Sequence, residues 1–162
     1  MWSESTSLWQ SLGEAEYLHL LLETLPLYGL GLGLLLLLIT AFSKEKICRL
    51  VAIVLLGASC LSVVPYLSCR HAATPRILAT RPVSLGAAIE AQTRLREHTA
   101  WTYHLGAVLS VFTMAMMGNR YLTRVLIALG VYAVFLFGLS LWLHKKECEL
   151  YHPNILRHTA GE

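Results

Sequence analysis

The chain has 162 residues, of which 56% are hydrophobic and 14% charged, and its mean hydropathy is +0.56. This composition favours an integral membrane protein over a soluble one, with residues 1–162 forming one domain and membrane lipid around it. The formal net charge of +3 is spread over the connections and forms no basic face, which excludes nucleic acid as an expected partner.

Four apolar runs predict membrane-spanning helices. Each is close to the roughly 20 residues that an α-helix needs to cross about 30 Å of hydrocarbon. A soluble core helix does not stay apolar on every face for this length. The runs cover residues 18–42, 50–67, 99–117 and 121–143. We therefore predict an all-α fold, a four-transmembrane-helix bundle of up-down topology.

Two further helices are expected beside these spans. Residues 84–97 follow Pro82 with an amphipathic pattern and are expected to run into the third span. A short interfacial helix is expected before the first span, from Trp2, Leu8, Trp9 and Leu12.

Small residues and prolines mark the first two spans. Gly29 and Gly33 have the small-xxx-small spacing that lets two helix backbones approach, and residues 57–59 offer a similar notch. Pro26 and Pro65 lie in the same two spans, where a proline removes a backbone hydrogen bond and kinks the helix.

The connections predict the orientation. In a four-span chain both termini and the connection 69–96 share one side, whereas the turns 43–49 and 118–124 share the other. The two turns are rich in Lys and Arg, and the segment before the first span has acidic but no basic residues. The positive-inside rule therefore puts both termini outside the cytoplasm. Five arginines in the connection 69–96 leave the inverted orientation open.

The histidines suggest a haem site. His19 lies near the start of the first span and His104 about five residues inside the third, at a similar height. Two imidazoles facing each other can supply both axial bonds to haem iron, and Pro26 and Gly106 are expected to leave room for the ring. His98 is the alternative ligand, but it points about 240° away from His104 around the helix. In the alternative without haem, His104 hydrogen-bonds a neighbouring helix. All seven histidines fall at this end: His19, His71, His98, His104, His144, His152 and His158.

A carboxylate-bridged metal site is a further alternative. Residues 16–19 and 149–152 both read Glu-x-x-His, the spacing of di-iron and di-manganese sites in helix bundles. Glu16 would then be a metal ligand, and Glu23 and Glu97 would be the bridging carboxylates. Chance matches to so short a motif are common, so the haem hypothesis is preferred.

The cysteines narrow the class of protein. Cys48, Cys60, Cys69 and Cys148 include no Cys-x-x-Cys pair, which excludes the disulfide-generating four-span enzymes. A c-type haem attachment motif is also lacking, so any haem would be haem b. Cys69 and Cys148 both fall just outside spans on the histidine side, and a disulfide between them is predicted if that side is oxidising.

Residues 18–29, LHLLLETLPLYG, precede an apolar span, a short basic turn and a second span that ends VPYL at residues 64–67. With residues 82–92, PVSLGAAIEAQ, this pattern resembles the bacterial membrane proteins known as domain of unknown function 2231, over residues 18–117. Some relatives are joined to Rieske-type iron–sulfur domains, so the resemblance implies membrane electron transfer in the bacterial inner membrane. It implies a role for His19, whereas the other two histidine positions hold Thr24 and Gln92 here.

These patterns predict a small multi-pass protein that binds haem b near the extracytoplasmic face. It would transfer electrons as a subunit of a larger membrane redox complex, with other membrane or extracytoplasmic redox subunits as partners. The alternative is a cofactor-free accessory subunit that packs against such a complex. A stand-alone enzyme is not favoured, because the chain has almost no soluble mass with which to bind a substrate.

Overall fold

The computed structural model describes residues 22–43, 45–80 and 83–151. Every regular element in these ranges is a helix, which confirms the predicted all-α class for this part of the chain. The predicted interfacial helix around Trp9 lies outside it. The helices are α3 (Leu25–Ser43), α4 (Lys46–Leu61), α5 (Val63–Thr80), α6 (Val83–Ala115) and α7 (Leu122–Tyr151).

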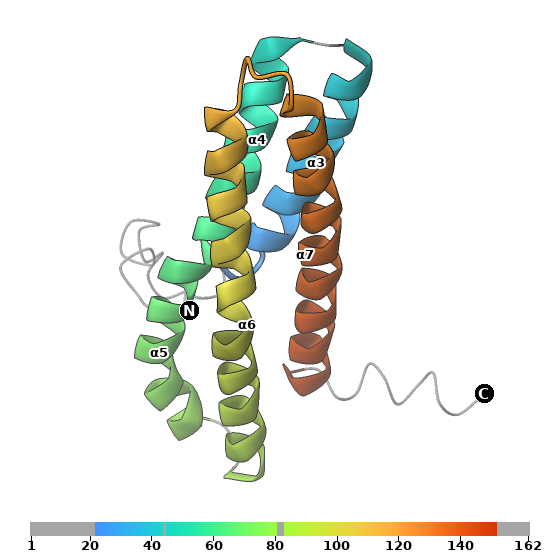
Figure 1. Cartoon of the computed structure of the whole chain (residues 1–162). Helices are drawn as coiled ribbons and strands as arrows, with labels where there is room; N and C mark the ends of the chain where they lie inside the picture. Colours follow the sequence, from blue (N-terminus) through green and yellow to red (C-terminus); the bar gives the residue numbers. More distant parts are fainter. Residues whose placement is uncertain (1–21, 44, 81–82, 152–162) are drawn as a thin grey trace, which may run out of the picture.

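The helices pack along a common direction (Figure 1). α4 makes its most extensive contacts with α3 and α6, and α7 packs against α6 and α3. The α3–α4 and α6–α7 connections lie at the same end, and the α5–α6 connection lies at the opposite end (Figure 1). Because α5 and α6 continue past the other helices at that end, they form a projecting helical pair.

Three segments are long and apolar enough to cross a membrane, and they indicate a multi-pass membrane protein: Leu25–Ser43, Lys46–Pro75 and Leu122–Leu150. α6 does not meet this criterion. Its first half is polar and includes the charged residues Glu90 and Arg94, so its apolar part is short. The predicted amphipathic helix 84–97 and most of the predicted span 99–117 are one continuous helix, as expected. The chain leaves α6 through a turn in which Gly118 has φ 97°.

Both prolines lie next to an interruption of the helix, as predicted. Pro65 has no N–H to donate to the Leu61 carbonyl, and α4 ends at Leu61 before α5 begins at Val63. Pro26 lies in the first turn of α3, just after a bend at Thr24. The two interruptions lie next to α3 and α4, which pack against each other.

The core runs along the bundle axis. Its buried side chains include Leu30 from α3, Leu56 from α4, Tyr103 from α6 and Leu136 from α7. The helices approach closely where they carry glycine. A Cβ atom at Gly29 would lie 2.0 Å from Ser59 Oγ. The predicted close approach of the first two spans is therefore confirmed at this position.

Replacing Gly29 by Ala is expected to lower the free energy of unfolding by about 1–3 kcal/mol, because the added methyl group must displace Ser59 on the facing helix. Titration with SDS in mixed micelles measures this difference. The matched control is Gly138→Ala on α7, where an added Cβ meets nothing within 4 Å. Equal stability of the two variants would contradict the close α3–α4 packing.

Candidate functional site

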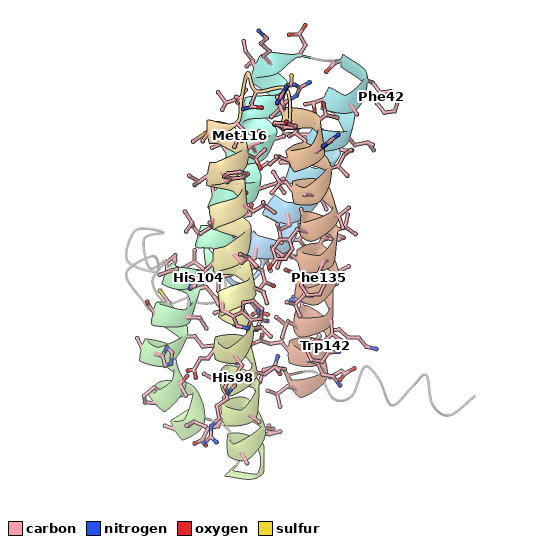
Figure 2. The ribbon with its side chains drawn as sticks, in the orientation of Figure 1. Phe42, His98, His104, Met116, Phe135 and Trp142 are labelled. Carbon is pink, nitrogen blue, oxygen red and sulfur yellow. The ribbon has the colours of Figure 1, made fainter. Side chains whose placement is uncertain are left out.

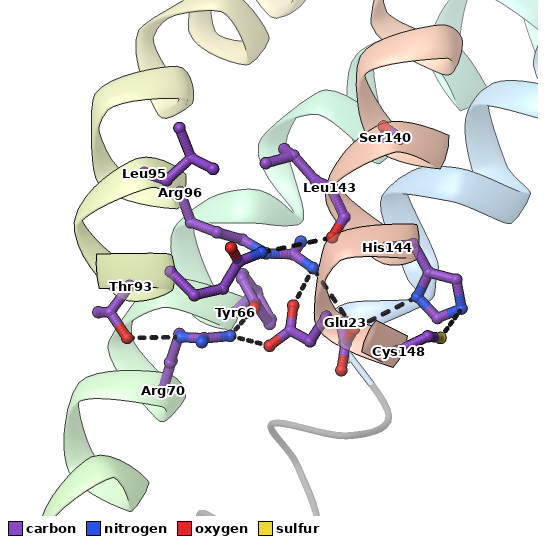
Figure 3. Close-up of polar contacts among 12 residues, drawn as sticks. Glu23, Tyr66, Arg70, Thr93, Leu95, Arg96, Ser140, Leu143, His144 and Cys148 are labelled. Atoms are coloured by element: carbon purple, nitrogen blue, oxygen red, sulfur yellow. Dashed lines mark hydrogen bonds and ion pairs between the residues drawn. The ribbon is translucent and has the colours of Figure 1, made fainter. Parts of the chain in front are cut away.

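Four charged side chains meet inside the bundle at the end where α5 begins (Figure 3). They are Arg70 on α5, Arg96 on α6, Glu147 on α7 and Glu23 just before α3, and together they form the buried ion network. One Glu147 oxygen accepts a hydrogen bond from Arg70 Nη1 and the other from Arg96 Nη2. Arg96 Nη2 also lies 3.4 Å from Glu23 Oε1. The network joins α5, α6, α7 and the residues just before α3.

The arginine heads are held by further contacts. Arg70 Nη1 donates to Tyr66 Oη at 2.6 Å, and Arg70 Nε donates to Thr93 Oγ1 at 3.0 Å. The Arg96 guanidinium lies over the Tyr66 ring, 5.1 Å from its centroid. Arg70 and Glu147 are each only 2% exposed. Such burial of charge is tolerated because each ion faces an opposite charge and fixed hydrogen-bond partners.

The sequence pattern did not predict this network. Arg70 and Arg96 were counted only among the basic residues of the connection 69–96, for the orientation of the chain, and no buried partner was predicted for either. Helices occupy residues 69–80 and 83–96, so both arginines lie on helix faces and point inward. The sequence did contain one signal, because opposite charges occur at the same end of the predicted spans. Arg70 follows the second span, Arg96 precedes the third, and Glu147 follows the fourth.

His144 and Cys148 extend the network to the surface (Figure 3). His144 Nδ1 lies 3.3 Å from Glu23 Oε1, and His144 Nε2 lies 3.6 Å from Cys148 Sγ. The Glu23 carboxyl lies before the first apolar helix. Burial, and then the negative charge of Glu147, raises the pKa of the Glu23 carboxyl, although Arg96 acts in the opposite direction. A polar path therefore runs from the buried network to an exposed thiol.

A cavity of about 10 Å³ lies beside the network, lined in part by Glu23, Arg96, Tyr103, Ser140 and His144. Tyr103 Oη and Ser140 Oγ are hydrogen-bonded to each other at 2.7 Å. This volume is enough for about one water molecule, far below the several hundred Å³ of an ordinary ligand pocket. The interior of the bundle is therefore closed to an organic substrate at this point.

The predicted haem ligands on α6 do not face the interior. His98 and His104 are both exposed on the outer surface of α6 (Figure 2). His19 lies outside the described residues, so the pairing of His19 with His104 stays a prediction. Of the other described histidines, His144 belongs to the polar path, and His71 Nε2 lies 2.6 Å from Glu97 Oε1 on an exposed surface.

A porphyrin does not fit between the helices near Gly106. A Cβ atom at this glycine would already lie 2.7 Å from Leu136 Cδ1 and 2.8 Å from Cys60 Sγ. The cavity next to Pro26 is the small one described above. The expectation that Pro26 and Gly106 leave room for the ring is therefore wrong: the glycine serves close helix packing instead.

The residues of the alternative metal site are not gathered either. Glu23 is paired with Arg96, whereas Glu97 contacts His71 on the exposed side of α5 and α6. Within residues 22–43, 45–80 and 83–151, no group of three or more His, Cys, Asp or Glu side chains could hold a metal ion. Glu16 lies outside these ranges, and the carboxylate-bridged site stays a prediction.

The two cysteines of the predicted disulfide are free thiols in the structure. Cys69 is half-buried on α5, and Cys148 is exposed on α7, where its sulfur contacts His144. The disulfide between them stays a prediction for the oxidised protein.

No family model matches the chain, and no similar curated protein or solved structure was found. The resemblance to domain of unknown function 2231 over residues 18–117 stays a prediction.

Proposed function

We propose that the chain is a small four-span accessory subunit of a larger membrane complex, and that it contacts its partner through the outer face of α6. The observation that carries this proposal is His104. Its side chain is exposed and makes no hydrogen bond to another described residue. An imidazole directed at hydrocarbon is costly, so a polar group of a partner chain is the favoured neighbour.

The surroundings of His104 define the proposed contact face. Trp101, Leu105 and Val108 flank it on α6 and are 63%, 47% and 63% exposed. Large aromatic and aliphatic side chains around a single polar group are typical of the core of a protein interface. The α6 outer face is the name used below for Trp101, His104, Leu105 and Val108.

The packing of α6 supports its role as the fourth span. Ala100, Tyr103 and Ala107 belong to the same core as Leu30 of α3 and Leu136 of α7. The second half of α6, from Thr99 to Ala115, contains no Asp, Glu, Lys or Arg. A segment packed between apolar helices and free of charge is well suited to the same membrane depth. Four spans would give the up-down arrangement, with both termini on one side.

The buried ion network supports a structural function at the end of this bundle. It joins α5, α6, α7 and the start of α3, and the cavity of about 10 Å³ beside Glu23 and Arg96 is too small for a substrate. The proposed setting is the bacterial inner membrane with both termini extracytoplasmic. Membrane lipid and other membrane subunits are the proposed partners.

Electron transfer through haem b is the second candidate function, and the exposed His104 again favours it. An imidazole without a hydrogen-bond partner among the described residues is free to coordinate iron. Because the interior near Gly106 is filled, the haem would lie outside the bundle, between the α6 outer face and another chain. An oxidised-minus-reduced spectrum of the purified complex tests this candidate. A b-type α-band that is lost in His104→Leu would support it, and a flat spectrum would exclude it.

Site-specific photo-cross-linking in membranes tests the accessory-subunit proposal. A photoreactive amino acid is placed at Trp101 or Val108 on the α6 outer face, and at Val134 on α7 as the control. Val134 is 60% exposed, similar to the other two. We expect one discrete protein adduct from both α6 positions and none from Val134. Equal labelling from all three positions, or no protein adduct from α6, would overturn the proposal.

A further inference from the structure

Cys148, His144 and Glu23 form a chain of contacts that the accessory-subunit function does not use. His144 and Cys148 are four residues apart on α7 and therefore share one face of the helix. His144 Nε2 lies 3.6 Å from Cys148 Sγ, and His144 Nδ1 lies 3.3 Å from Glu23 Oε1. The thiol is exposed, whereas the carboxylate is 9% exposed. These contacts place a nucleophile next to a base, and they place the base next to a carboxylate that orients it.

This order of groups is the arrangement that activates a nucleophile. A carboxylate on Nδ1 fixes the imidazole tautomer with its proton on that nitrogen, which leaves Nε2 free to accept the thiol proton. Glu23 is itself fixed, because Arg96 Nη2 lies 3.4 Å from the same oxygen. The buried ion network therefore fixes the orientation of the His144 imidazole through Glu23, which is a positioning residue.

The surface of α7 next to Cys148 indicates which kind of chemical group would become attached to the thiol. Ile127, Val134 and Leu141 precede Cys148 at intervals of seven residues and are 63%, 60% and 47% exposed. Residues seven apart drift by only about 20° around a straight helix, so these side chains form one apolar stripe that ends at the thiol. Lys145 and Lys146, next to Cys148, are exposed and mark the polar end of the helix.

We propose that Cys148 is an acylation site, at which a long-chain acyl group becomes attached as a thioester and lies along the apolar stripe of α7. This inference goes beyond the accessory-subunit function and does not depend on it. The stripe leads from the thiol toward the middle of the apolar helix, which is the direction that an attached hydrocarbon chain must take to enter the bilayer.

The step balances without a change of oxidation state. Cys148 Sγ attacks the carbonyl carbon of an activated acyl donor, a thioester or a phospholipid ester. The S–C bond forms, and the bond from that carbon to the leaving thiolate or alkoxide breaks. His144 Nε2 takes the thiol proton and passes it to the leaving group. The products are the acylated protein and a free thiol or a lysophospholipid.

The test uses the reduced full chain in mixed micelles with an alkyne-tagged hexadecanoyl thioester of coenzyme A. A second arm uses vesicles of phosphatidylethanolamine and phosphatidylglycerol whose acyl chains carry the same tag. Cys48 is the internal control, because it is an exposed thiol on α4 with no imidazole contact in the described part of the chain. The readouts are the intact mass, the labelled cysteine found by peptide mapping, and release of the label by neutral hydroxylamine.

We expect Cys148 to be labelled on the order of a hundredfold faster than Cys48 in at least one arm. The arm that labels identifies the donor. His144→Gln should reduce the labelling rate at Cys148 to that of Cys48. Glu23→Gln should change the pH dependence of labelling at Cys148 but not that at Cys48. Cys48→Ser should leave labelling at Cys148 unchanged. SDS titration of each variant separates these effects from loss of folding.

Three results would overturn the proposal. The first is equal labelling of Cys48 and Cys148 in both arms. The second is an unchanged Cys148 rate in a folded His144→Gln variant. The third is a protein purified without reductant whose mass is lower by two hydrogen atoms, with Cys69 and Cys148 linked. That result would assign Cys148 to the disulfide instead.

Discussion

Glu147→Gln lowers the free energy of unfolding by about 3–5 kcal/mol, because it removes the central acceptor of the buried ion network. The Glu147 carboxylate accepts one hydrogen bond from Arg70 and one from Arg96, and its side chain is 2% exposed. Glutamine keeps the shape but has a single oxygen, and its amide N–H₂ group faces a guanidinium that also only donates. Arg70 and Arg96 then both lose the buried carboxylate that they contact. Titration with SDS in mixed micelles measures the loss.

Glu149→Gln is the matched control, since it makes the same chemical change two residues further along α7. Glu149 lies near Lys145 and Lys146 at the surface, and the three side chains are 29%, 70% and 47% exposed. Exposed ion pairs contribute little, so we expect a change within about 0.5 kcal/mol. Equal losses in the two variants would show that Glu147 has no special role, and the inward placement of Arg70 and Arg96 would then be wrong.

The positions of the helices could be predicted, because hydrophobic runs are a direct signal. The runs 18–42 and 121–143 correspond to α3 and α7, and the amphipathic pattern of 84–97 correctly indicated that α6 begins well before its apolar half. The ends were less accurate. Polar residues continue a helix when they have partners inside the fold, and Arg70 and Arg96 have such partners in Glu147.

The position of His104 along the run 99–117 does not give the direction in which its side chain points. His104 is the histidine farthest inside a predicted span, but the angle around the helix decides what the side chain contacts. Tyr103, one residue earlier, is buried with Ala107, so the adjacent position is turned outward. The small residues at 100, 106, 107 and 110 mark the packed side of α6 and would have indicated this orientation.

The buried ion network required tertiary information. Its members are distant in sequence, and each one alone has the pattern of a charge flanking a span. Only the packing of α5, α6 and α7 brings the opposite charges together. The same packing places Glu23 beside His144, which no spacing rule connects, because the two residues come from opposite ends of the chain.

Replacing Arg70 and Arg96 by Met and Glu147 by Leu together should be far less harmful than Glu147→Gln alone. Because all three charges are removed together, none of the three is left buried without its partner. Exchanges of this kind in buried ion triads are often neutral or stabilising by about 1–4 kcal/mol. Thr93 Oγ1 keeps its hydrogen bond to the Ile89 carbonyl. Glu23 loses Arg96 and is expected to bind a proton, because burial already raises its carboxyl pKa.

The triple replacement also separates the structural from the functional role of the network. If the network only joins the helices, SDS titration should give a stability equal to or above that of the natural sequence, and the α6 outer face should still cross-link to its partner. A loss as large as that of Glu147→Gln would show that the space fits ions better than apolar side chains. Full stability with loss of the cross-link would show instead that the buried charges fix the helix arrangement that the partner recognises.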